Sequence, residues 1–154
     1  MEEIKTLKFV NKSPNPDPVF KCDGDSGFDL RAWVEDGDEI VLHPLERKLI
    51  HTGLYFEIPQ YTEIQVRPRS GLALKNGISL VNTPGTVDES YTGEVSAILI
   101  NLSNEDFVIH TGDRIAQAVL MPVFNKALVE FKKIDEITSD TERGAGGFGH
   151  TGVS

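Results

Sequence analysis

Residues 93–101 read GEVSAILIN, a short run rich in β-branched residues that predicts a β-strand. Turn signals flank this run, because Thr83-Pro84-Gly85 comes before it and His110-Thr111-Gly112-Asp113 comes after it. Similar runs and turn signals recur along the chain at intervals of roughly ten residues, while the helical period of 3.6 residues is almost absent. This pattern is typical of an all-β sandwich or barrel.

The expected strands extend outward from this run in both directions. They are Ile4–Val10, Gly27–Val34, Glu39–His43, Lys48–Ile58, Thr62–Arg67, Ile78–Val81, Gly93–Asn101, Phe107–Ile109, Ile115–Val123 and Leu128–Ile134. One short helical turn is expected at Gly71–Lys75, closed by Asn76-Gly77. A parallel α/β fold is excluded, because the chain has no helical crossovers of adequate length.

Composition and charge narrow the class of protein. The chain has 154 residues, of which 39% are hydrophobic and 25% are charged, as in an ordinary single globular domain. Its formal net charge of −9 disfavours a general nucleic-acid binder, because such proteins gain affinity by neutralising phosphates. A site for an anionic ligand must therefore be locally basic, and the arginines available for it are Arg31, Arg47, Arg67, Arg69, Arg114 and Arg143.

Cysteine content and hydrophobic runs indicate the compartment. The single cysteine, Cys22, cannot form an intrachain disulfide, and the chain has no CxxC or Cys/His spacing for a zinc module. The first ten residues, MEEIKTLKFV, contain acidic residues and lack the apolar region of a signal peptide. No apolar run approaches the roughly 18 residues that a membrane span needs. We expect a soluble, cytoplasmic protein with no membrane partner.

The composition changes only toward the C-terminal end. Residues 138–154 contain five glycines and almost no apolar residues, so this segment cannot bury enough surface to offset its ordering entropy. We expect a body of residues 1–137 and a mobile arm of residues 138–154.

Within this arm, residues 143–152 read RGAGGFGHTG. The run matches G-x-G-x-x-G and misses the P-loop pattern by His150 in place of lysine, but only five residues follow Gly149, so the helix that both motifs require is missing. Two interpretations stay open. The backbone N–H groups and Arg143 could wrap a polyphosphate, or the run is a disordered glycine-rich tail.

Three further stretches each allow a functional and an ordinary interpretation. Ser70 is expected to be the N-cap of the short helix, where free N–H groups beside Arg69 suit a phosphate; the alternative is an ordinary capped helix with a solvated arginine. Asp88, Glu89 and Glu94 could ligate a metal ion or activate a water molecule; the alternative is a solvated acidic turn. In the third stretch, Asp113-Arg114 suggests a plain salt bridge and Gln117 a surface amide.

The chain has one cysteine, Cys22, and four histidines, His43, His51, His110 and His150. Their spacing in the sequence matches neither a set of metal ligands nor a pair of a nucleophile and its base.

Five stretches in order resemble the motifs of the trimeric dUTP pyrophosphatases (dUTPases), and the resemblance spans nearly the whole chain. They are DSGFDL (25–30), RSGLA (69–73), GTVDESYTGE (85–94), GDRIAQAV (112–119) and RGAGGFGHTG (143–152). The resemblance implies a jelly-roll-like β-barrel that forms a homotrimer, with each active site shared between subunits. It also implies Mg²⁺-assisted hydrolysis of dUTP to dUMP and pyrophosphate, which supplies dUMP and keeps uracil out of DNA.

The resemblance assigns roles to residues between 82 and 96, which we expect to form a hairpin between two strands. Asp88 matches the aspartate that orients and deprotonates the attacking water, and Tyr91 matches the tyrosine beneath the deoxyribose. The residues that match the uracil-reading pocket are Asn82, Thr86, Val87 and Ser96.

The other motifs match groups that hold the phosphates and the metal. Those that match phosphate contacts are Arg69, Ser70, Gly71, Gln117 and Arg143. Phe148 matches a ring that stacks on uracil when the arm closes, with Gly149 beside it, and Asp29 matches an aspartate that contacts Mg²⁺ through water. The chain departs from the family where Ser26-Gly27-Phe28 replaces the commoner Ala-Gly-Tyr and where His150 replaces serine.

Two rival functions share this fold. The related dCTP deaminases need a glutamate five residues past the glycine that corresponds to Gly93, and Ile98 occupies that position here, so a deaminase is disfavoured. A non-enzymatic nucleotide-binding or regulatory protein is the second rival. The presence of Asp88, Tyr91 and Arg143 together argues against it.

Overall fold

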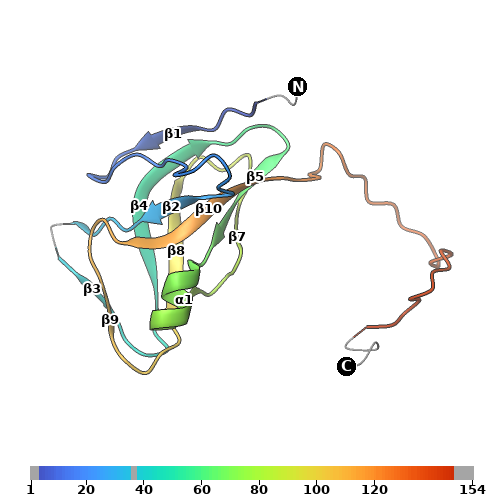
Figure 1. Cartoon of the computed structure of the whole chain (residues 1–154). Helices are drawn as coiled ribbons and strands as arrows, with labels where there is room; N and C mark the ends of the chain where they lie inside the picture. Colours follow the sequence, from blue (N-terminus) through green and yellow to red (C-terminus); the bar gives the residue numbers. More distant parts are fainter. Residues whose placement is uncertain (1–3, 36–37, 148–154) are drawn as a thin grey trace.

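The computed structural model of the chain describes residues 4–35 and 38–147 and shows an all-β body (Figure 1). Sheet A has the strand order β1-β4-β8-β6, from β1 (Lys8–Asn11), β4 (Arg47–Glu57), β8 (Glu94–Asn101) and β6 (Ile78–Leu80). Sheet B has the order β2-β10-β5-β7, from β2 (Phe28–Arg31), β10 (Arg114–Pro122), β5 (Thr62–Arg67) and β7 (Gly85–Val87). A small third sheet pairs β3 (Ile40–Leu42) with β9 (Phe107–Ile109), and the helix α1 (Ser70–Asn76) connects β5 to β6. Every strand pairing among these elements is antiparallel.

Strict alternation along the central strands separates a core face from an outer face. In β8, Val95, Ala97, Leu99 and Asn101 are buried while the residues between them are partly exposed. Strand β5 alternates in the same way, and Ile64 at its centre is fully buried. Buried side chains of both sheets form one hydrophobic cluster, because each sheet turns one face inward. The outer faces are therefore free to carry polar side chains for a site.

Asn101, at the end of β8, is a fully buried polar residue in this core. Its amide nitrogen donates to the carbonyl oxygens of Leu42 (2.8 Å) and Glu105 (2.7 Å). Its amide oxygen accepts from the backbone N–H of Ser103 (2.9 Å) and from the Ser103 hydroxyl (2.7 Å). One side chain thus ties the turn after β8 to β3.

Most expected elements are present with small shifts at their ends, and two expectations were wrong. No strand forms at Leu128–Ile134: within the described residues the last strand ends at Pro122, and the chain then runs away from the body with no strand beside it (Figure 1). Ser70 is not the N-cap of α1, because Arg69 holds that position in extended conformation and no side chain caps the helix. The strand β7 was missed, because Pro84 and Gly85 read as a turn although the pairing with β5 already begins at Gly85.

In the described part of the chain, no helix is long and apolar enough to cross a membrane.

The Asn101→Ala variant tests the buried amide. It removes the amide that serves the Leu42 and Glu105 carbonyls and the Ser103 N–H, although the Glu105 carbonyl retains another partner, the Ser103 hydroxyl (3.1 Å). We therefore expect the free energy of unfolding to fall by about 3 kcal/mol. Urea denaturation measures this change. Asn104→Ala, at an exposed position of the same turn, is the control and should change stability by less than about 0.5 kcal/mol. An equal effect of both variants would contradict the role given to Asn101.

Candidate active site

A pocket of about 390 Å³ opens beside the segment that joins β7 to β8. It is lined by Asn82, Thr86, Val87, Asp88, Tyr91 and Ser96, together with Leu49, His51, Glu94, Val95 and Ile98. The first six are the residues for which the sequence predicted contacts with the base, the sugar or the attacking water. The fold therefore gathers this part of the predicted site in one place. We call it the hairpin pocket after the hairpin expected from the sequence, although β7 pairs with β5 and β8 with β4 and β6, so that the segment between them connects two sheets.

Glu94, the first residue of β8, organises one wall of the hairpin pocket. One carboxylate oxygen accepts the backbone N–H groups of Thr52 (3.1 Å) and Gly53 (2.8 Å), and the other lies 2.8 Å from Nδ1 of His51. Burial raises the pKa of Glu94, but the Gly53 N–H, the His51 ring and the Thr52 N–H outweigh it, so the pKa is lowered overall. Glu94 is thus an ionised structural group, which corrects the suggestion that it ligates a metal ion or activates water.

The contact with Glu94 falls at a bend in β4. The pairing of β4 with β8 shifts register between Ile50 and Leu54, and Gly53 in this interval has a φ of +71°, a conformation that favours glycine. The bend aims two consecutive backbone N–H groups at one carboxylate oxygen. It also leaves His51 on the outer face, where it lines the hairpin pocket.

Tyr91 is held against the start of β8. Its hydroxyl donates to the carbonyl oxygen of Glu94 (2.9 Å). The ring lies so close to Gly93 that a Cβ added there would be 2.5 Å from the Tyr91 oxygen. Only glycine at position 93 lets the ring adopt this position.

The three acidic residues of the hairpin have separate roles in the structure. The Glu89 carboxylate accepts the backbone N–H of Tyr61 (2.9 Å) and the side-chain amide of Asn125 (3.0 Å). Asp88 is exposed, and among the described residues no hydrogen bond or ion pair engages its carboxylate. Asp88 is therefore the acidic residue of this hairpin whose carboxylate is available to a bound molecule.

A second pocket, of about 280 Å³, lies on the outer face of sheet B, and we call it the cationic pocket. The register pairs Asp29 of β2 with Gln117 of β10, and Gln117 with Arg67 of β5, so the three residues form one row across the sheet. Its charged lining residues are Lys21, Asp25, Asp29, Arg69 and Arg114. The Gln117 amide donates to the Pro68 carbonyl (2.9 Å), so it is held rather than solvated.

Asp29 is the centre of the charge cluster in this pocket. Its carboxylate accepts from Nε of Arg69 (2.9 Å) and from Nη1 of Arg114 (3.2 Å), and Nζ of Lys21 lies 3.5 Å away. Burial raises the pKa of Asp29, but Arg69, Arg114 and Lys21 together outweigh it and lower the pKa overall. The cluster therefore holds an ionised carboxylate with an excess of cations around it.

This cluster overturns two expectations about charged residues. Arg69 is not a solvated arginine, because it also donates to the carbonyl oxygen of Arg114 (3.0 Å). Arg114 does not pair with Asp113, whose carboxylate instead accepts the backbone N–H of His110 (2.8 Å). Neighbours in the sequence point to different partners here because they stand at the turn into β10, where the chain changes direction.

The remaining predicted residues lie at the edges of these pockets or away from them. Ser70 and Gly71 are exposed and follow Arg69 in the chain. Arg143 is exposed on the segment that leaves the body, where its Nε donates to the carbonyl oxygen of Gly146 (2.9 Å). Phe148, Gly149 and His150 lie outside the described residues.

Sequence reasoning missed two residues of the site and one contact between its residues. His51 and Lys21 line the pockets although no motif includes them, and the partner of Arg114 is 85 positions away in the chain. Only the register of β2 on β10 brings Asp29 and Arg114 together, and a single sequence does not reveal that register. Among residues 4–35 and 38–147, no group of three or more histidine, cysteine or acidic side chains is arranged to hold a metal ion.

The comparisons with known proteins all find similarity to proteins of the same description. A family model described as dUTPase matches residues 14–152. The deoxyuridine 5'-triphosphate nucleotidohydrolase of Finegoldia magna is 51% identical over 146 residues, which are 95% of this chain and 98% of that protein. The protein of the same name from Treponema denticola is 55% identical over 137 residues, which are 89% of this chain and 91% of its own length. A solved structure of a Staphylococcus bacteriophage 80α dUTPase mutant with dUpNHpp covers 97% of this chain and 100% of its own, with a TM-score of 0.83 and 25% identity. The matched residues include both pockets.

The Glu94→Gln variant tests the wall of the hairpin pocket. An amide has one acceptor oxygen and no charge, so we expect the free energy of unfolding at pH 7 to fall by about 1–2 kcal/mol. The folded state lowers the pKa of Glu94 below its ordinary value of 4.5, so its contribution is present above pH 4.5 and is lost as the pH falls through the folded value. Urea denaturation across pH should therefore show the gap between the variant and the wild type closing in acid.

The matched control is Glu35→Gln, at an exposed position outside both pockets, which should change stability by less than about 0.5 kcal/mol. A gap between wild type and Glu94→Gln that stays constant below pH 4 would contradict the assignment.

Proposed function

The chain belongs to the dUTPase family, and from this premise we propose that it hydrolyses dUTP to dUMP and pyrophosphate by in-line attack of water on the α-phosphorus. The observation that supports this most directly is the hairpin pocket, which gathers the matched base, sugar and water residues and leaves the Asp88 carboxylate unengaged. Such an enzyme supplies dUMP and keeps uracil out of DNA. A cytoplasmic location agrees with the exposed free thiol of Cys22, which persists in a reducing compartment.

In this proposal the hairpin pocket selects the nucleotide. Asn82 and the backbone around Thr86, Val87 and Ser96 present fixed donors and acceptors to uracil, and a wrong base leaves some of them buried without partners. The Tyr91 ring, fixed by Glu94 and Gly93, lies beneath the deoxyribose and leaves no room for a 2′-hydroxyl group. Both selections depend on a rigid hairpin, which the Glu94 carboxylate supports.

Asp88 is the general base of the proposed reaction. An ionised carboxylate within hydrogen-bond reach of a water molecule accepts its proton as the oxygen attacks phosphorus, and pyrophosphate departs on the opposite side. A carboxylate already engaged by other groups is a weaker base, and Glu89 and Glu94 are both engaged. Asp88 therefore fits the role better than its acidic neighbours.

The cationic pocket and the arm hold the phosphates. Arg69 and Gln117 face the pocket, and Ser70 and Gly71 add a hydroxyl and a backbone N–H at its edge. Arg143 contacts the terminal phosphate, and Phe148 and Gly149 close over the base when the arm folds back. Residues 138–154 serve as this arm, and residues 1–137 form the body.

The residues of the cationic pocket fit a magnesium ion that is held mainly by the substrate. Both carboxylate oxygens of Asp29 already accept from arginines, so Asp29 suits contact with the water shell of the ion rather than direct ligation. Mg²⁺ retains several waters and binds phosphate oxygens readily. When bound, it neutralises charge on the triphosphate.

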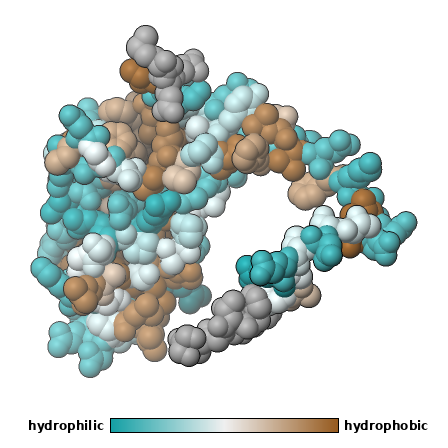
Figure 2. All heavy atoms as spheres, turned by 45° about the vertical axis from the view of Figure 1, so that its right-hand side comes forward, coloured by the Kyte–Doolittle hydropathy of each residue, from teal (hydrophilic) through white to brown (hydrophobic). Residues whose placement is uncertain are grey.

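A homotrimer with shared sites is the assembly that these features support. The hairpin pocket and the cationic pocket share no lining residue within one chain. The segment after β10 exposes large apolar side chains, including Phe124 (86% exposed), Phe131 (99%) and Ile137 (81%), and Figure 2 shows hydrophobic residues along the part that leaves the body. Exposure on this scale marks a surface that a partner covers. We infer that neighbouring subunits cover it and complete each site.

A single assay separates the proposed function from its rivals. The protein is incubated with dUTP or dCTP and Mg²⁺, and released pyrophosphate and ammonia are measured. We expect pyrophosphate from dUTP and no ammonia from dCTP, because Ile98 cannot activate water. Ammonia from dCTP would identify a deaminase. If neither pyrophosphate nor ammonia were released, the protein would be a nucleotide-binding protein without either activity.

The Asp88→Asn variant tests the general base. The amide keeps the shape of the side chain but accepts no proton, so we expect kcat to fall by about 10²–10⁴-fold with dUTP binding retained. Steady-state pyrophosphate release measures kcat, and Glu89→Gln is the control, since Glu89 is engaged structurally. A near-wild-type kcat for Asp88→Asn would assign the base to another group.

Truncation after Glu142 tests the arm. Residues 138–145 are exposed, 146–147 are partly exposed, and none of them belongs to the hydrophobic core, so the melting temperature should stay within a few degrees of that of the full chain. We expect kcat to fall strongly, because the lid that fixes the in-line geometry is lost. A shorter truncation that removes only Val153 and Ser154 should retain activity. A large loss of melting temperature on truncation after Glu142 would show that the arm belongs to the body.

A further inference from the structure

The turn before β2 holds the backbone of one surface lysine, Lys21, through several contacts. The Asp25 carboxylate accepts the backbone N–H groups of Lys21 (3.2 Å) and Cys22 (3.0 Å), and the Asp25 N–H donates to the Cys22 carbonyl (3.1 Å). On the other side of Lys21, the Phe20 ring packs edge-on against buried Phe28, with ring centroids 5.7 Å apart. The backbone of Lys21 is therefore fixed on both sides.

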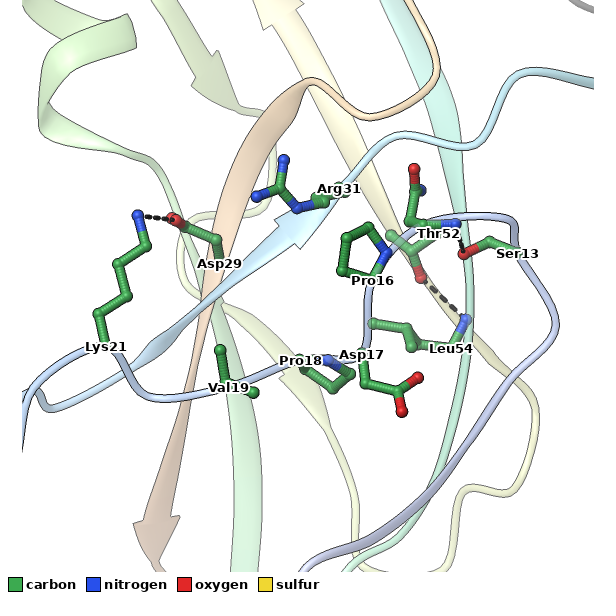
Figure 3. Close-up of a pocket in the computed structure, with 11 residues that line it drawn as sticks. Ser13, Pro16, Asp17, Pro18, Val19, Lys21, Asp29, Arg31, Thr52 and Leu54 are labelled. Carbon is green, nitrogen blue, oxygen red and sulfur yellow. Dashed lines mark hydrogen bonds and ion pairs between the residues drawn. The ribbon is translucent and has the colours of Figure 1, made fainter.

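The side chain of Lys21 reaches the centre of the cationic pocket. Figure 3 shows its ammonium group pointing toward Asp29, and Nζ lies 3.5 Å from the nearer carboxylate oxygen. Lys21 lines both the cationic pocket and the small adjoining cavity drawn in Figure 3. It therefore stands where these two hollows meet.

Lys21 differs from the two arginines of the cluster in how much of its binding capacity is used. Arg69 and Arg114 contact Asp29 at 2.9 and 3.2 Å, and their side chains are 25% and 38% exposed. The side chain of Lys21 is 57% exposed and makes the longest of the three contacts. An ammonium group has three N–H donors, so Lys21 retains donors for an incoming anion while the arginines keep Asp29 ionised.

Lys21 accounts for the net positive charge of this pocket. Three cationic side chains face two carboxylates there, a net charge of +1 in a chain whose total is −9. Removal of Lys21 alone would make the pocket neutral. A polyphosphate site in an acidic protein depends on such a local excess of positive charge.

We propose that Lys21 is a further polyphosphate-binding residue, whose ammonium group leaves Asp29 to donate to a non-bridging oxygen of the pyrophosphate part of the substrate. This inference rests on the proposed function, because it takes the cationic pocket as the phosphate site. Arg69 and Arg114 keep Asp29 in place when Lys21 moves. The contact exists in substrate and transition state alike, so it acts on KM and on pyrophosphate affinity rather than on kcat.

The test compares Lys21→Met and Lys21→Arg with Lys8→Met in the full-length protein. Lys8 forms a similar exposed lysine–carboxylate pair with Glu57 (2.7 Å) outside both pockets, which makes it a matched control. Calorimetry with inorganic pyrophosphate and MgCl₂ should show binding about fivefold weaker for Lys21→Met, as one partly exposed ionic contact provides. Lys21→Arg should bind within about twofold of the wild type, and Lys8→Met should be unchanged. The KM for dUTP should rise in parallel with kcat unchanged.

Two results would overturn the role of Lys21. One is pyrophosphate affinity equal in Lys21→Met, Lys8→Met and the wild type. The other is a fall in kcat with unchanged affinity, which would place the effect of Lys21 on Asp29 alone. Because binding of pyrophosphate is measured without turnover, a wild type that releases no pyrophosphate from dUTP would refute the proposed function while the test of Lys21 still gives an answer.

Discussion

The carboxylate of Glu94 ties the start of β8 to the bend in β4, and the hairpin pocket is built around this contact. A partly buried carboxylate is costly unless its oxygens are satisfied, and here two backbone N–H groups and a histidine satisfy them. The bend exists because Gly53 adopts a conformation that other residues avoid. This contact holds His51 beside the hairpin pocket, and the backbone carbonyl of Glu94 anchors Tyr91. The wall of the hairpin pocket is thus supported by the strands β4 and β8 rather than only by the segment that joins β7 to β8.

Charge is divided between two surfaces of the chain. The hairpin pocket contains acidic side chains, whereas the cationic pocket gathers three positive side chains around Asp29. In the proposed function, this separation keeps the general base from forming an ion pair with the phosphate-binding cations, which would weaken both. Within one chain, the cations of the cationic pocket pair with Asp29 and leave Asp88 unpaired. An assembly that brings the hairpin pocket of one subunit to the cationic pocket of another would join the two functions without this loss.

The sequence predicts the all-β class and most of the strands because burial of one face imposes a local pattern, as in 94–101. It does not predict β7 (Gly85–Val87), since Pro84 and Gly85 are turn residues in isolation and only the pairing with β5 makes Gly85 the first residue of a strand. The pattern at 128–134 has strand character, but within the described residues it pairs with no other strand, so periodicity alone was misleading there. Local motifs include several lining residues of both pockets but not His51 or Lys21, and the contacts of Asp29, Glu94 and Lys21 depend on register over long separations and on one bend.

In the proposed homotrimer, each active site combines the hairpin pocket of one subunit with the cationic pocket of another. The direct measurement is complementation: Asp88→Asn and Arg69→Ala, each weakly active alone, are co-expressed so that they form mixed trimers, and dUTP hydrolysis is assayed. Random mixing of equal amounts gives about a quarter of the sites an intact hairpin and an intact cationic pocket. We expect the mixture to regain activity toward that fraction of the wild type. A mixture no more active than the two variants measured separately would show that each site is built from a single chain, and would contradict the claim.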